Sequence, residues 1–286
     1  MYLIKKIMFW PKNYKFAISF SFDLDIDSFW RQKLISANAD PKDPVVISMG
    51  QYGANVGAYR ILNLLEKYKI KATFFIPGEI ADRYTQLVLK IKNMGHEIAH
   101  HGYEHIDLYS LSPERQREEI IKGKKTLEQK IGVTPLGYRS PGGFSIYTLE
   151  ALLDNGIIYD SSLMGADMPY IYEIENKKII EIPWKYVYDD FVFYSFNFFP
   201  SLDYRKTSPV NPRTLTEIWK DEFDVLYNEG LFMTIIGHPH LIGQPSRVKA
   251  LEDFIKYVFS KNNVWIAPYI EIAEHVKNNI NDFEKL

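Results

Sequence analysis

The chain has 286 residues, of which 46% are apolar and 24% charged, so it is long enough to bury the core of one large domain or two small ones. A formal net charge of −2 gives no basic excess for nucleic acid, and the absence of cysteine excludes disulfides, thiolate metal sites and a cysteine nucleophile. Residues 1–12 make a poor signal peptide, and no apolar run approaches the ~20 residues of a membrane span. We therefore expect a cytoplasmic protein with neither a nucleic-acid nor a membrane partner.

From Ala17 onward, short apolar runs alternate with segments of helical periodicity, a pattern typical of β/α proteins. The runs with strand character are residues 17–22, 72–76, 97–100, 136–139, 157–160, 179–182, 232–236 and 264–267. Such a set of about seven to eight strands is close to the number that closes a barrel. Because no internal repeat or low-complexity tract interrupts it, we predict an α/β fold in which residues 1–286 form one domain.

Helices are expected between these strands. One begins at Pro113, with Ser112 as its cap, and reaches about Ile131, where Gly132 follows as its stop. Another places an apolar stripe along residues 61–68, which we expect to pack on the barrel.

Two segments break the alternation. Residues 27–55 form a long insertion that carries two prolines and two glycines, and residues 186–212 include the aromatic-rich stretch 188–199. Long loops in compact domains are often functional. Each segment could wall a pocket or form a subunit contact, and the sequence does not choose between these roles.

Polar residues with catalytic or metal-binding chemistry follow four of the predicted strands. Asp23 and Asp25 end the first strand and are two residues apart, so their carboxylates are expected on one face. His101 and His105 follow the third strand at a spacing that lets two imidazoles approach one ion. Such a D-x-D pair alone is often a cap or a solvated turn, but with the histidine pair it indicates a divalent-metal hydrolase centre.

A second histidine pair, His96 and His100, lies in the same stretch and is expected to be structural. Arg139 ends the fourth strand at the start of an Arg-Ser-Pro-Gly-Gly turn, and His238 follows the strand at 232–236. Either feature alone would suit an ordinary turn. Four coincidences at the carboxyl ends of strands, where barrel enzymes build their active sites, favour the catalytic interpretation.

The ordered motifs Phe-Asp-Leu-Asp (22–25), His-Gly-Tyr-Glu-His (101–105), Arg-Ser-Pro (139–141), Tyr-Asp-Ser-Ser (159–162) and His-Pro (238–239) resemble those of the polysaccharide deacetylase family, carbohydrate esterase family four. The resemblance spans residues 17–273, nearly the whole chain. It implies a distorted (β/α) barrel with a divalent metal, usually Zn²⁺, that hydrolyses an amide.

The resemblance also assigns roles to individual residues. Metal ligands in this family match Asp25, His101 and His105. The catalytic base matches Asp23, and the arginine that orients it matches Arg139.

For protonation of the leaving group, His238 matches the general acid, and Asp160 matches the aspartate that tunes that acid. The backbone N–H of Gly142 takes the place of the oxyanion donor. This assignment agrees with simple chemistry, because an amide nitrogen departs readily only when an acid protonates it.

Leu24 separates two aspartates that are adjacent in the usual family motif. This spacing resembles that of one branch of the family, which holds allantoinase-like proteins, cyclic imide hydrolases and a peptidoglycan deacetylase subgroup. Further segments share the resemblance to this branch, namely residues 51–60, 159–170 and 238–247, Trp184, and the pair Asp189 and Asp190. Its better-known members tend to be homotetramers, so the resemblance implies a homo-oligomer.

The expected substrate is an N-acetylated sugar or peptidoglycan fragment, from which the enzyme would remove the acetyl group. A small cyclic amide, imide or ureide is the alternative substrate. A non-catalytic metal-binding or glycan-binding relative is the alternative of a different class.

Overall fold

The computed structural model describes residues 10–195 and 209–280. Most of the N-terminal segment, and residues 196–199 of the aromatic stretch, lie outside these described residues. Among the described residues, the helices are all too short or too polar to cross a membrane.

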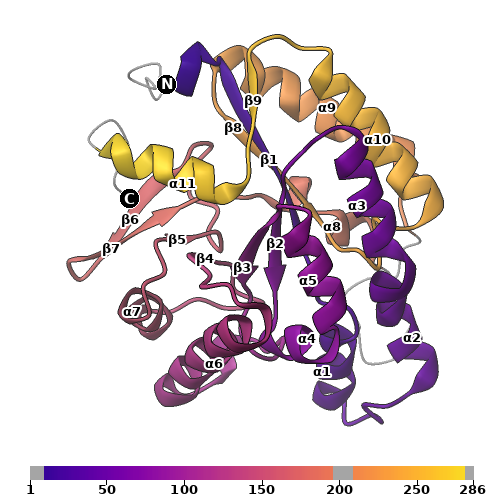
Figure 1. Cartoon of the computed structure of the whole chain (residues 1–286), viewed down its shortest axis with the longest axis vertical. Helices are drawn as coiled ribbons and strands as arrows, with labels where there is room; N and C mark the ends of the chain where they lie inside the picture. The colour runs from indigo at the N-terminus through magenta and orange to yellow at the C-terminus, as the bar shows by residue number, and fades with distance from the viewer. Residues whose placement is uncertain (1–9, 196–208, 281–286) are drawn as a thin grey trace.

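Nine strands form one curved sheet at the centre of the described structure (Figure 1). Their order is β6-β7-β5-β4-β3-β2-β1-β8, with β9 pairing β1, and every pairing is parallel except that of β6 with β7. The strands are β1 (Phe16–Asp23), β2 (Thr73–Ile76), β3 (Glu97–His100), β4 (Gly137–Tyr138), β5 (Tyr159–Asp160), β6 (Tyr170–Ile174), β7 (Lys177–Glu181), β8 (Phe232–Gly237) and β9 (Val264–Ile266). The predicted α/β fold, a distorted (β/α) barrel, is confirmed.

Helices surround this sheet (Figure 1). They are α1 (Ser28–Ser36), α2 (Pro44–Tyr52), α3 (Ala58–Lys67), α4 (Gly78–Arg83), α5 (Thr85–Asn93), α6 (Pro113–Thr126), α7 (Ile146–Asp154), α8 (Asp190–Tyr194), α9 (Pro212–Glu229), α10 (Pro245–Phe259) and α11 (Tyr269–Asn278). Short turns of other helix types occupy η1 (Pro11–Asn13), η2 (Gly53–Gly57), η3 (Leu108–Ser110), η4 (Leu127–Ile131) and η5 (Tyr186–Tyr188). As predicted, Ser112 caps α6, and η4 carries the helix on to Gly132, whose φ of 66° ends it.

The alternation of side chains along β1 determines what enters the barrel. Phe16, Ile18, Phe20 and Phe22 join the main apolar cluster, which includes residues of the surrounding helices. The intervening positions are small or polar, and the hydroxyls of Ser19 and Ser21 bond to carbonyls of neighbouring segments. Because side chains alternate with a period of two, Asp23 continues this second, inward series.

Two expectations about local structure were wrong. The insertion at 27–55 is not an extended loop, because most of it folds into α1 and α2. A Cβ atom at Gly50 would lie 2.3 Å from the carbonyl oxygen of Ile26, so only glycine permits α2 to pack this closely on the corner after β1. The second error is the omission of β6, which pairs with β7 as an antiparallel hairpin.

Candidate active site

The carboxyl ends of β1, β3, β4 and β8 meet around one pocket of about 520 Å³. Its lining combines charged groups with aromatic rings, among them Asp23, Asp25, His101, His105, Arg139, Asp189 and His238 with Phe29, Tyr109, Phe144, Trp184, Tyr186 and Phe191. The structure therefore brings most of the predicted site residues together.

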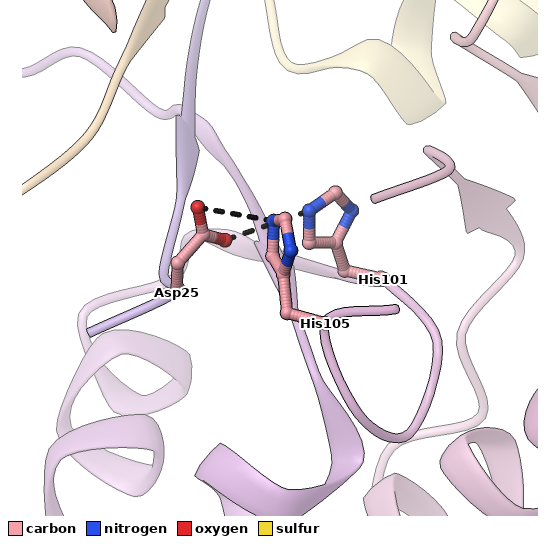
Figure 2. A group of neighbouring side chains, drawn as sticks. All are labelled: Asp25, His101 and His105. Carbon is pink, nitrogen blue, oxygen red and sulfur yellow. Dashed lines mark ion pairs between the residues drawn. The ribbon is translucent and has the colours of Figure 1, made fainter. Parts of the chain in front are cut away.

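Asp25, His101 and His105, which all line this pocket, form a compact cluster (Figure 2). Each offers a ligand atom within 4.8 Å of the others, with His101 Nε2 3.5 Å and His105 Nε2 3.3 Å from oxygens of the Asp25 carboxylate. The three side chains point toward one another from the ends of two different strands (Figure 2). Two imidazoles and one carboxylate are a ligand set typical of a catalytic zinc site.

The bonding of these residues fits a metal ion. Oδ1 of Asp25 is buried and has no hydrogen-bond partner among the described residues. His101 places Nδ1 2.7 Å from the carbonyl oxygen of Arg139, so this nitrogen carries the proton and Nε2 keeps its lone pair. Burial alone would raise the pKa of Asp25, but His105, His238 and His101 hold it well below its ordinary value. A buried carboxylate that faces two imidazoles is a suitable site for a divalent cation.

The insertion supports the histidine loop. In α1, the hydroxyl of Ser28 lies 3.3 Å from the backbone N–H of His105, which donates to it, and Phe29 packs edge-on against the His105 ring. From α6, the carboxylate of Glu119 accepts the backbone N–H groups of Tyr103 and Glu104 at 3.2 and 2.9 Å. Since Phe29 also lines the pocket, this part of the insertion walls the site.

Asp23 stands beside the cluster and is held by Arg139. The guanidinium Nη1 donates to Asp23 Oδ1 at 2.6 Å, while Nη2 donates to the Tyr269 hydroxyl at 2.9 Å and Nε to the Ser161 carbonyl at 3.2 Å. Both partners are at least nine-tenths buried. Several simultaneous bonds fix the arginine, which in turn fixes one oxygen of Asp23.

On the other side of the pocket, His238 faces the same carboxylates. Its Nε2 lies 3.6 Å from Asp25 and 4.0 Å from Asp23, while its Nδ1 lies 2.7 Å from Oδ1 of Asp190. Burial alone would lower the pKa of His238, but the carboxylates of Asp190 and Asp189 raise it well above its ordinary value. The two carboxylates therefore favour the protonated form of His238.

The expectation that Asp160 pairs with His238 is corrected by this geometry, since Asp190 takes that place. Asp160 instead accepts two hydrogen bonds from Ser162, its own near neighbour in the chain. The tuning carboxylate comes from a different region of the sequence because Asp189 forms a parallel bridge with Ile236, which lays this segment alongside β8.

Gly142, the expected oxyanion donor, lines the pocket. Its N–H donates to the Ser140 hydroxyl at 3.3 Å. The second histidine pair lies apart from the cluster, since His100 Nε2 bonds to the Ile120 carbonyl and His96 Nδ1 accepts the Ala72 N–H.

Sequence reasoning missed the contributions of Ser28 and Glu119, which position the histidine loop, and of Asp190. The adjacent acidic pair at 189–190 was noticed only as part of a motif. Two consecutive carboxylates in an apolar, aromatic segment, where burial is expected, were the available signal.

Three comparisons relate this architecture to known proteins. The family described as polysaccharide deacetylase matches residues 38–157. The peptidoglycan deacetylase of Helicobacter pylori is 27% identical over 90% of this chain and 94% of its own. A structure from Mycobacterium smegmatis, assigned to the polysaccharide deacetylases, has a TM-score of 0.84 at 32% identity, with 95% of this chain and 93% of that chain covered.

The PuuE allantoinase is also similar, with a TM-score of 0.81 at 27% identity and coverage of 93% of this chain and 92% of its own. The combined sequence and structural matches define the class. This chain belongs to the polysaccharide deacetylase family, carbohydrate esterase family four.

Proposed function

We propose that the chain is a divalent-metal-dependent hydrolase of a C–N amide bond, which removes an N-acetyl group from a sugar or peptidoglycan-type substrate. One observation carries this proposal: a carboxylate held by an arginine and a histidine held by a carboxylate flank the same three candidate metal ligands. The name of the Helicobacter relative, a peptidoglycan deacetylase, supports the substrate class.

Asp25, His101 and His105 would hold the metal, and their donor set suits Zn²⁺. A divalent ion bound there would polarise the scissile carbonyl and lower the pKa of a water molecule.

Two residues that line the pocket carry out the proton transfers. Asp23, held by the hydrogen bond from the Arg139 guanidinium, accepts the proton from the attacking water. His238, protonated beside Asp190, gives a proton to the nitrogen that leaves. The acid is needed because an amine anion is too basic to depart unaided.

The Gly142 N–H would stabilise negative charge that develops on the carbonyl oxygen. For this role it must exchange its long bond to Ser140 for one to the substrate. Preorganised backbone donors of this kind are effective because they need little rearrangement during the reaction.

A second candidate is hydrolysis of a small cyclic amide, imide or ureide. The similarity to the PuuE allantoinase over 93% of the chain favours it. The aromatic side chains that line much of the pocket would suit a compact ring as well as a sugar.

The test combines metal analysis with a substrate panel. The purified protein is assayed for bound metal, then for hydrolysis of N-acetylated sugars, chito-oligomers, peptidoglycan, allantoin, hydantoins and succinimide. We expect one metal per chain and acetate release from an acetylated substrate, abolished by chelation and restored by Zn²⁺. Turnover of only the cyclic compounds would favour the second candidate, and stoichiometric metal without any turnover would favour a non-catalytic relative.

A further inference from the structure

Two carboxyl groups lie buried together outside the proposed metal centre. Asp160 ends β5 and Glu181 ends β7, and these residues are direct partners in the parallel register of the two strands. Both are 0% exposed. Buried carboxyl groups this close cannot both be ionised without a large cost in free energy, so their role needs an explanation.

A chain of hydrogen bonds leads from Asp160 to the pocket. The Asp160 carboxylate accepts the Ser162 hydroxyl at 2.8 Å and the Ser162 N–H at 3.0 Å. The same Ser162 oxygen accepts the Ser140 N–H at 2.9 Å, and the Ser140 hydroxyl accepts the Gly142 N–H at 3.3 Å. Asp160 is therefore connected, through two serines, to the proposed oxyanion donor.

Glu181 anchors the neighbouring loop. Its Oε1 accepts the backbone N–H of Leu163 at 2.8 Å, and Leu163, like Ser140, Gly142 and Ser162, lines the pocket. Its Oε2 is buried and receives no hydrogen bond from a described donor, so this oxygen is available to carry a proton.

The surroundings of Glu181 favour its protonated form. Burial and the nearby charge of Asp160 raise the pKa of Glu181 well above its ordinary value. Burial also raises the pKa of Asp160 to about 6. Neutral Glu181 can then donate to Asp160, which remains an anion and accepts all the donors around it.

We infer that Glu181 is a positioning residue: sharing one proton with Asp160, it fixes the strand-end loops that carry Ser140, Gly142 and Leu163 and so presents the Gly142 N–H to the reacting carbonyl. This inference rests on the proposed function for its catalytic meaning. It gives Asp160 a role different from the one predicted from the sequence.

Because Glu181 carries the shared proton, Glu181→Gln and Asp160→Asn should differ in their effect on this hydrogen-bond chain. Glu181→Gln keeps an acceptor for the Leu163 N–H and a donor toward Asp160, so it reproduces neutral glutamic acid. Asp160→Asn replaces a two-oxygen acceptor by one oxygen and an NH₂ group, which cannot accept the bonds from Ser162 and Glu181 together. Glu181→Leu removes every bond at this position.

The experiment measures kcat and KM for these variants on the substrate found in the panel, with bound Zn²⁺ as a control for the metal site. We expect Glu181→Gln to remain within about twofold of the unsubstituted protein, and Glu181→Leu and Asp160→Asn to lose roughly tenfold or more in kcat with a much smaller change in KM. Ser162→Ala, at a partly exposed position, removes the hydroxyl that joins Asp160 to the Ser140 N–H but leaves both buried carboxyl groups in place, and it should also lower kcat.

Glu97→Gln is the matched control, because Glu97 is another carboxyl group with a pKa raised by burial but lies at the opposite end of the parallel strands. It should leave kcat unchanged. An equal loss of kcat in Glu181→Gln and Glu181→Leu would overturn the inference that Glu181 shares a proton with Asp160. Unchanged kcat in both Glu181→Leu and Ser162→Ala would overturn the positioning role.

Amide hydrogen exchange at Ser140, Gly142 and Leu163 provides a readout that needs no substrate. Exchange should accelerate in Glu181→Leu and Asp160→Asn but not in Glu181→Gln. If the unsubstituted protein turned over nothing in the panel, the proposed function would fail while this measurement still decided the inference. Identical exchange in all variants would contradict it.

Discussion

The metal side and the acid side of the pocket are built in different ways. Asp25, His101 and His105 come directly after β1 and β3, so short motifs and strand ends determine where they lie. On the acid side, His238 follows β8, but its partner Asp190 lies 48 positions earlier and arrives through packing alongside that strand. Motif and strand pattern therefore locate the ligands, whereas the environment that tunes the acid depends on tertiary contacts.

The largest expected effect is loss of the metal, which should distinguish the pair His101 and His105 from the pair His96 and His100. His105→Ala should reduce bound metal from about one equivalent per chain to background and abolish turnover, because a three-ligand site loses one ligand. His100→Ala should keep the metal and cost about 1–3 kcal/mol in the free energy of unfolding, because it leaves the Ile120 carbonyl without its buried partner. Metal analysis and urea unfolding measure both effects; loss of metal only from His100→Ala would reverse the assignment.

The next effect concerns Arg139, whose side chain bonds to Asp23 and whose backbone carbonyl bonds to the imidazole of His101. Arg139→Lys keeps the charge but cannot bond at once to Asp23, Tyr269 and Ser161. We expect kcat to fall about 10²-fold with metal retained, since the base is then less firmly positioned. Steady-state kinetics on the metal-loaded protein is the measurement, and an unchanged kcat would argue against an orienting role.

A third prediction asks which carboxylate raises the pKa of His238: Asp190, which bonds to it in the structure, or Asp160, which was predicted from the sequence. The acid works when protonated, so activity should decline as pH rises through the pKa of His238. Removing the negative charge in Asp190→Asn lowers that pKa, so the alkaline limb should move about one pH unit toward lower pH.

Asp160→Asn is the matched comparison, because it also removes a buried carboxylate. It should lower kcat without moving the alkaline limb. A shift of the limb in Asp160→Asn but not in Asp190→Asn would restore the original assignment.

The smallest effect is on stability. The pKa of Glu181 in the folded protein lies above its ordinary value of about 4.5, so the folded state binds an extra proton. Its contribution is complete below the unfolded pKa and is lost as pH rises toward the folded pKa, by at most about 1.4 kcal/mol per pH unit. Glu181→Gln cannot titrate, so its stability relative to the unsubstituted protein should improve from pH 5 to pH 8. Urea unfolding across that range tests this; parallel curves would contradict it.

Much of the fold could be predicted because apolar runs and strand ends are local features. β6 was missed, since its hairpin turn places Glu175 and Asn176 at positive φ without the glycine that usually signals such a turn. α2 could have been found, because Asp43 and Pro44 are a favourable cap and first residue. The pairing of Asp190 with His238 could not be predicted, because no local sequence pattern shows which strand a connecting segment will lie against.

The central claim is that Asp23 and Asp25 have different roles, Asp23 as the base and Asp25 as a metal ligand. Substituting each of them separately tests this claim most directly. We predict that Asp23→Asn binds about one metal per chain while losing roughly 10³-fold in kcat, and that Asp25→Asn loses the metal itself. Metal content and turnover are measured on the same preparations. An active Asp23→Asn protein, or metal lost from Asp23→Asn and kept by Asp25→Asn, would contradict the account.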